Sequence, residues 1–323
     1  MKRIIVIFLV LTMAVSLTAC GAGNVASLAD DGTVSVVTTI FPIYDWTRQV
    51  LGEDSEAELT FLLSSGVDLH SYQPTAADLL KLATCDLFIY VGGESDEWAE
   101  DALSEAANPN MIALNLMDVL GEDLAEEELV EGMEGEAEEE EADEIEYDEH
   151  IWLSLKNAET LVQAISDAMA EVDPENAESY AANASNYVNQ LSNLDAAYAS
   201  AVAEGEKDTL LFGDRFPFRY LTDDYDLNYY AAFSGCSAET EASFETVVFL
   251  ADKVDELDLP AVLTIENSDG RIAQTIVENT GSKDQQILAM DSMQGTTGRD
   301  AANGAAYLDI MEKNLDILKQ ALQ

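Results

Sequence analysis

The longest uninterrupted helical pattern in the chain runs from Glu175 to about Ala203, where alanine and leucine recur at helical spacing. Asp173-Pro174 precedes it, and nothing breaks the pattern before Gly205. A helix of roughly 30 residues spans about 45 Å, a length that suits a strut between two lobes. This segment therefore predicts a chain divided into two parts by one long rigid helix.

Strand-like and helical segments alternate on both sides of that helix. Strand patterns occur before it at residues 34–40, 58–63, 86–91 and 111–114, and after it at 210–212, 229–233, 261–265 and 286–290. Alternation of this kind predicts parallel sheets covered by helices. We therefore predict an α/β protein of two lobes, residues 34–174 and 205–323, joined by a helix at 175–204. Each lobe is expected to hold a parallel four-stranded sheet flanked by helices.

The first residues indicate export. A charged start at Met1 to Arg3 leads into an apolar run from Ile4 to Leu17, which closes in the small-residue sequence LTAC with Cys20 before Gly21. This order predicts a secretory signal over residues 1–19. The cysteine at the cleavage point also resembles a bacterial lipobox, which implies a lipid on Cys20 and a tether over 20–33 at the outer face of a membrane. An ordinary cleaved signal with an accidental cysteine is the alternative.

The charge balance excludes some partners. The chain has 64 acidic and 14 basic residues, a formal net charge of −50, which argues against nucleic acid because its phosphates would be repelled. Residues 121–149 are more than half aspartate and glutamate and have no apolar period. We predict a solvated loop there.

Only two histidines are present, His70 and His150. Acidic residues follow predicted strands at Asp214, Glu266 and Asp291, and in parallel α/β sheets ligands bind beyond the carboxyl ends of strands. Imidazole nitrogens and carboxylate oxygens suit Zn²⁺ or Mn²⁺. The same spacing also fits structural histidines and acidic helix caps, so the pattern alone leaves both interpretations open.

Two segments carry a family resemblance. The segment around His70, GVDLHSYQPTAADLLKLATCDLFIYVGGESDEW, and the segment DEHIWLS around His150 resemble motifs of the zinc- and manganese-binding solute-binding lipoproteins of ABC transporters. The resemblance implies that His70, His150 and Asp291 are metal ligands. It also implies a monomeric, extracytoplasmic binding protein that delivers a divalent metal, Zn²⁺ before Mn²⁺, to a membrane permease with a separate ATPase subunit.

The chain departs from that family in two places. The loop before His150 is acidic where zinc members often have histidines, so weak cation collection and a plain solvated charge run both remain open. Gly213 aligns with a ligand of the second lobe, and glycine has no side chain. Asp214 is the first substitute; Glu266, a water molecule or an acid of the segment Glu239-Thr240-Glu241 are the alternatives. Arg215 or Arg219 is expected to pair with surrounding acids.

Other classes of function make different demands. No GxxxxGK[ST] phosphate loop is present, so ATP hydrolysis would belong to a partner subunit, and no hydrolase motif supports a secreted metallohydrolase. A surface adhesin, in which the metal only stabilises the fold, is a third hypothesis. Trp46, Trp98 and Trp152 are predicted to be packing anchors. A disulfide between Cys85 and Cys236 and two separate buried thiols both remain open.

Overall fold

The computed structural model describes residues 33–134, 146–237 and 241–323, of which Val34–Gln323 form one compact unit. The predicted signal peptide at 1–19, the predicted lipidation site Cys20 and all but the last residue of the predicted tether lie outside these described residues. Within the described part of the chain, no helix is both long and apolar enough to cross a membrane.

The first lobe is built on a parallel sheet in the order β2-β1-β3-β4. Its strands are β1 (Ser35–Thr38), β2 (Glu58–Phe61), β3 (Leu87–Tyr90) and β4 (Ile112–Asn115). The connecting helices are α2 (Phe41–Leu51), α3 (Ala76–Thr84), α4 (Trp98–Ser104) and α5 (Leu116–Leu120), and α6 (Leu155–Val172) follows later in the chain. The chain adds β2 on one side of β1 and then β3 and β4 on the other side, so the strand order switches between β1 and β3. In parallel α/β sheets, ligands bind beyond the carboxyl ends of the strands at such a switch point.

The second lobe repeats this plan with the order β6-β5-β7-β8, again all parallel. Its strands are β5 (Thr209–Phe216), β6 (Asn228–Ser234), β7 (Ala261–Ile265) and β8 (Gln286–Met290). Its helices are α8 (Arg219–Asp224), α9 (Phe244–Leu257), α10 (Arg271–Asn279), α11 (Gly298–Ala302) and α12 (Tyr307–Ala321). Each of the eight predicted strands is therefore confirmed, and so is the pair of four-stranded parallel sheets.

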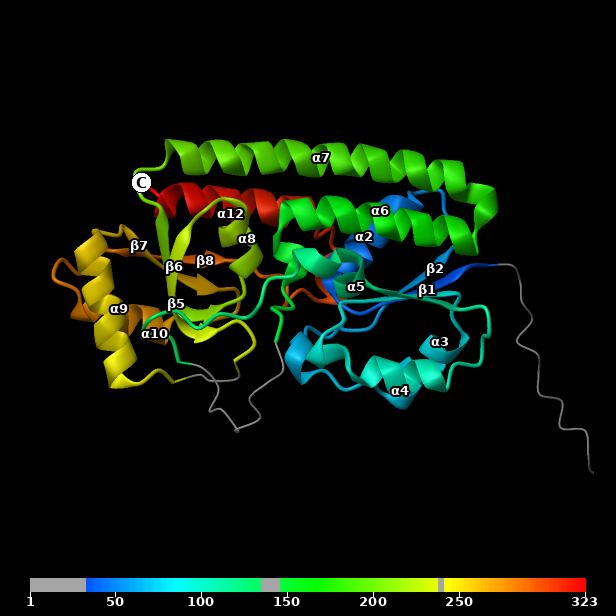
Figure 1. The fold of residues 1–323 in the computed structure, drawn as a ribbon, viewed down its shortest axis with the longest axis horizontal. Helices are drawn as coiled ribbons and strands as arrows, with labels where there is room; N and C mark the ends of the chain where they lie inside the picture. Colours follow the sequence, from blue (N-terminus) through cyan, green and yellow to red (C-terminus); the bar gives the residue numbers. More distant parts are fainter. Residues whose placement is uncertain (1–32, 135–145, 238–240) are drawn as a thin grey trace, which may run out of the picture. The chain divides into compact units, whose positions relative to one another are not determined.

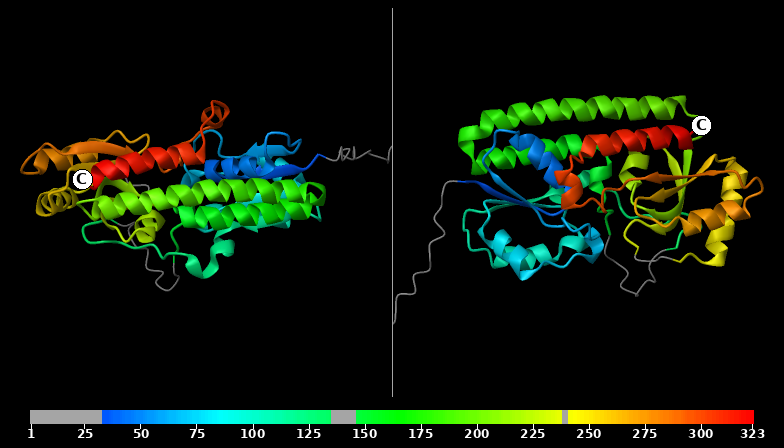
Figure 2. Two further views of the ribbon diagram at one scale, coloured as in Figure 1. Left: turned by 90° about the horizontal axis from the view of Figure 1, so that it is seen from above. Right: turned by 180° about the vertical axis from the view of Figure 1, so that it is seen from behind.

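The predicted long helix is α7 (Ala177–Glu204), preceded by a short 3-10 turn at Pro174–Asn176. Its 28 residues span about 42 Å. Figures 1 and 2 show α7 running past both sheets, with α6 beside it over the first lobe and α12 beside it over the second. Because α7 is packed along its length and not exposed as an isolated rod, it holds the two lobes in one unit.

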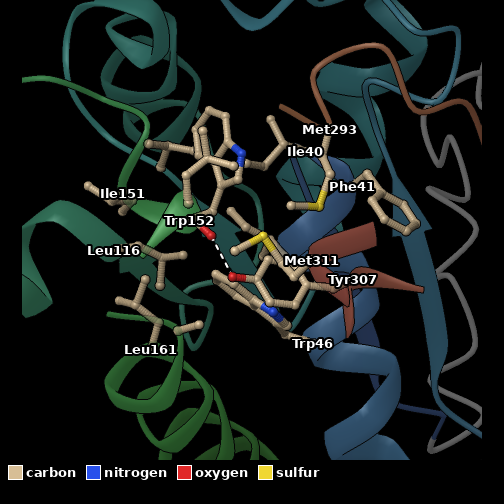
Figure 3. Close-up of a cluster of buried hydrophobic side chains, with 14 of the residues drawn as sticks. Ile40, Phe41, Trp46, Leu116, Ile151, Trp152, Leu161, Met293, Tyr307 and Met311 are labelled. Atoms are coloured by element: carbon tan, nitrogen blue, oxygen red, sulfur yellow. Dashed lines mark hydrogen bonds between the residues drawn. The ribbon is translucent and has the colours of Figure 1, made fainter. Parts of the chain in front are cut away.

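Aromatic, aliphatic and methionine side chains pack together in the core where the two lobes meet (Figure 3). Trp46 and Trp152 are fully buried, which confirms the prediction that they are packing anchors, whereas Trp98 is half-buried. The hydroxyl of Tyr307 donates to the carbonyl oxygen of Trp152 at 2.7 Å. The indole nitrogen of Trp152 donates to the carbonyl oxygen of Ser292 at 2.8 Å. Two residues of the second lobe are thus hydrogen-bonded to the segment that directly follows His150.

The acidic stretch at 121–149 differs from the solvated loop that the sequence predicts. Its described ends pair with each other, since the Glu127 amide donates to the Glu146 carbonyl and the Asp148 amide to the Ala125 carbonyl, both at 2.9 Å. Asp148 and Glu149 are only 3% and 4% exposed. The prediction is wrong at the carboxyl end of this stretch because Asp148 contacts His150 and Glu149 contacts His70, which composition cannot reveal.

Candidate metal centre

His70 is placed by a single 3-10 turn after β2. The turn spans Leu69–Ser71, and the Asp68 side chain caps it by accepting from the His70 amide at 3.1 Å. Leu69 is buried in the core and anchors the turn. The imidazole of His70 is therefore held at the carboxyl edge of the first sheet, where it is 15% exposed.

His150 is fully buried at the point where the acidic stretch ends and α6 is about to begin. The Asp148 carboxylate accepts hydrogen bonds from the His150 amide at 2.8 Å and from its ring Nδ1 at 3.0 Å. A carboxylate only accepts, so the Nδ1 of a neutral His150 carries the proton and its Nε2 presents a lone pair. A carboxylate behind a histidine is the usual partner of a metal-binding imidazole.

His70 has the same kind of support. Its Nδ1 lies 2.7 Å from the Ser95 hydroxyl and 3.4 Å from Oε2 of Glu149. The other oxygen of Glu149 accepts from the Ser95 amide at 2.9 Å. With Nδ1 hydrogen-bonded to the Ser95 hydroxyl, the Nε2 of His70 is also the ring nitrogen that remains available.

The two available nitrogens face each other, with 3.3 Å between Nε2 of His70 and Nε2 of His150. Two nitrogens bound to one tetrahedral zinc ion at about 2.0–2.1 Å are themselves separated by about 3.3 Å. When both rings are neutral with their protons on Nδ1, two lone pairs point into the same space, an arrangement that a cation stabilises. The structure therefore brings together the two histidines that the sequence singles out, at a spacing that suits one metal ion.

The two imidazoles respond oppositely to their surroundings. Burial, followed by the neighbouring His150, lowers the pKa of His70 to about 4. Burial also lowers the pKa of His150, but the Asp148 carboxylate outweighs it, so the pKa of His150 is raised above its usual value. The first proton to enter the pair therefore goes to His150, and His70 stays neutral at physiological pH.

A third group that the sequence interpretation missed joins the histidines. Ligand atoms of His70, His150 and Cys236 all lie within 4.8 Å of one another, the one such group of histidine, cysteine, aspartate and glutamate side chains among the described residues. Cys236 follows β6, so the rule that ligands lie beyond strand ends could have found it. Gly235 allows the approach, because a Cβ there would lie 2.9 Å from Cε1 of His150.

The structure explains why Gly213 has no functional replacement at its own position. A Cβ on Gly213 would lie 2.6 Å from Cα of Ala273 on α10, so any side chain would collide with backbone. The register of β5 against β6 shifts between Phe212 and Arg215, and this irregularity contains Asp214. Asp214 accepts from the Arg215 amide at 2.9 Å and is not in the histidine group.

Asp291 and Glu266 lie near each other at the carboxyl edge of the second sheet, also outside the histidine group. Glu266 accepts hydrogen bonds from the amide and hydroxyl of Ser292 at 2.7 and 2.9 Å and from the Gly295 amide at 3.0 Å. Its carboxylate is thus committed to holding a loop. Burial and then the Glu266 charge raise the pKa of Asp291 to about 6, and its Oδ1 accepts from the Met293 amide at 2.8 Å.

The predicted arginine pairing is confirmed at both positions. Arg215 contacts Asp68 at 2.7 Å, and Arg219 contacts Glu128 at 2.7 Å. Burial alone would raise the pKa of Asp68, but Arg215 outweighs burial and keeps it below its usual value. The Arg215 pair crosses from the second lobe to the turn that carries His70, so this cation is neutralised next to the site.

The remaining predictions have simple outcomes. Cys85 and Cys236 are both free thiols. Glu241 is exposed, while Glu239 and Thr240 lie outside the described residues.

Residues 36–321 match the model of a protein family described as the periplasmic component A of the zinc-uptake complex, ZnuA. The chain belongs to this family. The ZnuA family model covers both sheets, α7 and all three residues of the histidine–cysteine group. The agreement therefore extends over the whole described fold and not over one motif.

Individual relatives agree with the assignment. The zinc-binding lipoprotein AdcA of Streptococcus pneumoniae (strain R6) is 30% identical over 290 residues, which cover 90% of this chain and 56% of AdcA. The high-affinity zinc uptake system protein ZnuA of Bacillus subtilis (strain 168) is 28% identical over 318 residues, covering 98% of this chain and 97% of that protein. The chain thus spans 56% of the length of the streptococcal relatives that it matches.

Among solved structures, the Zn(II)-bound ZnuA-like domain of Streptococcus pneumoniae AdcA superposes with a TM-score of 0.71 at 27% identity. The superposition covers 90% of this chain and 99% of that domain. The two-lobed architecture with its long helix is therefore the architecture of a domain whose solved structure contains zinc.

Proposed function

We propose that this protein captures Zn²⁺ outside the cytoplasm and delivers it to the permease of an ABC transporter, with His70 and His150 as its metal ligands. It binds and releases the ion without catalysis. ATP hydrolysis belongs to a separate subunit. The protein acts as a monomer held at the outer face of the membrane through a lipid on Cys20.

One observation carries the proposal: two imidazole Nε2 atoms face each other at 3.3 Å while both Nδ1 atoms are engaged from behind. A histidine pair held only for structural reasons has no need to direct two ring nitrogens into one space. The names of the ZnuA-family relatives support zinc as the ion.

The carboxylate that completes the site is a separate proposal. We favour Asp291 over Asp214, because the family motif includes Asp291 and the hydrogen bond from Trp152 to Ser292 ties its loop to the segment after His150. Asp214 lies in the β5 irregularity, where the neighbouring Arg215 and not Asp214 makes contact with the His70 turn. Glu266 is held by its own loop and is not part of this proposal.

The test is a titration of chelator-stripped protein with Zn²⁺ and with Mn²⁺, measured by calorimetry. His70→Ala and His150→Ala are each expected to weaken zinc binding by about a hundredfold or more. The reason is that the binding free energy of a tight zinc site, about 10–16 kcal/mol, is distributed over only a few ligands. Ser71→Ala, an exposed neighbour of His70, is the matched control and should bind like the unaltered protein. Stoichiometric tight binding that survives both histidine substitutions would refute the site, and tighter binding of Mn²⁺ would refute the choice of metal.

A further inference from the structure

We propose that Cys236 is a third protein ligand of the metal, bound through its sulfur, and that this sulfur sets the preference of the site for Zn²⁺ over Mn²⁺. The inference rests on the proposed metal-binding function and deepens it. It assigns to the second lobe a ligand that the family motif does not include.

The geometry supports a shared ion. The Cys236 sulfur and one ring nitrogen of each histidine already lie within 4.8 Å of one another. Around tetrahedral zinc, with bonds of about 2.0–2.1 Å to nitrogen and about 2.3 Å to sulfur, a ligand nitrogen and a ligand sulfur are separated by about 3.5 Å. A small inward movement of the turn that carries Cys236 would reach this distance, and one tetrahedral position would remain for water or a carboxylate oxygen.

The turn that carries Cys236 is anchored on the side facing the first lobe. The Ser237 amide donates to the Ser234 carbonyl at 3.4 Å, and Arg215 donates to the Ser237 carbonyl at 3.4 Å. The same guanidinium contacts Asp68 beside His70. An ion bound by Cys236 and both histidines would therefore be held by both lobes, which the two histidines alone cannot achieve because they belong to the first lobe.

The surroundings of the thiol favour a cation. The carboxylates of Asp148, Glu127 and Glu149 act on Cys236 through their charges, so the negative potential around its sulfur attracts a cation. Glu149 has a buried oxygen, Oε2, without a hydrogen-bond donor, and it faces the His70 ring at 3.4 Å. When a divalent ion binds, the sulfur–hydrogen bond breaks, a sulfur–metal bond forms and the proton passes to solvent, because the charge of the ion displaces protons from coordinating thiols.

Sulfur as a ligand discriminates between the two candidate metals. Soft thiolates select zinc, whereas manganese prefers carboxylate and water oxygens. Two histidines completed only by carboxylates would lean towards Mn²⁺. With Cys236 as a ligand, the site is expected to favour Zn²⁺ although the chain lacks a third histidine.

X-ray absorption of the zinc-loaded protein tests the assignment directly. One sulfur scatterer at about 2.3 Å from zinc is expected in the unaltered protein, and only nitrogen and oxygen neighbours in Cys236→Ser. With Co²⁺ as a second probe, a sulfur-to-cobalt charge-transfer band in the near ultraviolet should appear in the unaltered protein and vanish in Cys236→Ser. Cys85→Ser is the matched control, because Cys85 is a buried thiol whose sulfur donates to the Leu82 carbonyl at 3.2 Å, and this variant should keep both signals.

Affinity measurements complete the test. Cys236→Ser should lower zinc affinity by about a hundredfold, while Cys236→Asp should narrow the ratio of zinc to manganese affinity. A zinc-loaded protein without sulfur at the metal would overturn this inference and leave the proposed function intact, provided that the histidine variants still lose zinc. If the unaltered protein shows no sulfur signal and the histidine variants bind zinc as tightly as it does, both this inference and the proposed function are overturned.

Discussion

The two sheets have the same strand order, so the carboxyl ends of β2 and β6 occupy corresponding places in the two lobes. The chemistry at these places differs. β2 leads to His70, supported by Ser95 and Glu149, whereas β6 leads to Cys236 on a turn anchored by Arg215. The first lobe thus offers two imidazoles with engaged Nδ1 atoms, and the second offers one thiol beside a neutralised cation.

This comparison shows that the strand topology determines which positions can carry a metal ligand but does not determine which residue type occupies them. The family position on β5 is closed, since Gly213 packs directly against the backbone of Ala273. The position after β6 is available and contains the cysteine. Under the proposal that Cys236 binds the metal, the second lobe supplies its ligand after β6 and not on β5, because parallel strands end at the same edge of the sheet.

The largest expected effect is a difference between the two lobes in how much their residues contribute to zinc affinity. His150→Ala in the first lobe should weaken zinc binding by about a hundredfold or more, and Asp291→Asn in the second by about tenfold or less. The reason is that His150 is in the group of converging ligand atoms and Asp291 is not. Competition against a zinc-binding dye measures both variants; an equal or larger loss for Asp291→Asn would break the comparison.

Restoring the family ligand at Gly213 should fail. Gly213→His is expected to reduce the free energy of unfolding by about 1–3 kcal/mol or more without raising zinc affinity, because its Cβ would overlap backbone atoms of α10. Gly213→Ala should show most of the same loss. Gly281→Ala is the matched control in this lobe, since the nearest atom to its Cβ would be a side-chain oxygen at 3.4 Å. Urea denaturation measures all three; a stable Gly213→His variant with improved affinity would contradict the closed position.

Each lobe also carries an acid with a raised pKa near the carboxyl edge of its sheet: Asp96 is buried and Asp291 is half-buried. Burial, opposed by hydrogen bonds from the Gly92 and Val91 amides, raises the pKa of Asp96 to about 7, whereas the pKa of Asp291 is raised only to about 6. Both folded pKa values exceed the unfolded ones, so the folded state binds more protons and stability falls as pH rises from about 4 through each folded pKa.

Asp96→Asn should remove the larger part of this pH dependence. Between pH 5 and pH 8, we expect the metal-free protein to lose about 2 kcal/mol more stability than Asp96→Asn, and the corresponding difference for Asp291→Asn to be smaller. Urea denaturation at the two pH values, with chelator present, measures both. Parallel pH profiles for the unaltered protein and Asp96→Asn would show that Asp96 ionises normally.

The smallest effect concerns the support of one histidine. Asp148→Asn should lower zinc affinity by about tenfold, because an amide is a weaker partner for Nδ1 of His150 and fixes the ring less firmly. Glu122→Gln, an exposed acid of the same stretch, is the control and should leave affinity unchanged. The dye competition assay measures both; equal losses would mean that the whole acidic stretch acts through charge and not through contact.

The sequence by itself determined the architecture. Strand and helix periods gave all eight strands, and the unbroken pattern before Gly205 gave α7, because these features depend on local spacing of apolar residues. The capping box that opens α3 was also predictable: Thr75 and Asp78 exchange hydrogen bonds at 2.9 and 3.3 Å. The sequence also pointed to His70 and His150, because they are the only two histidines and both lie near predicted strand or helix ends.

Only the tertiary structure determined which residues lie next to the two histidines in the site. Cys236 lies 86 residues after His150, and no local period connects them; only the approach of one lobe to the other brings them together. The burial of Asp148 and Glu149 inside an otherwise acidic stretch was equally invisible, because composition reports average solvation and not individual contacts. Which position can carry a ligand depends on tertiary packing. At position 213, for example, the close contact with α10 leaves no room for a side chain.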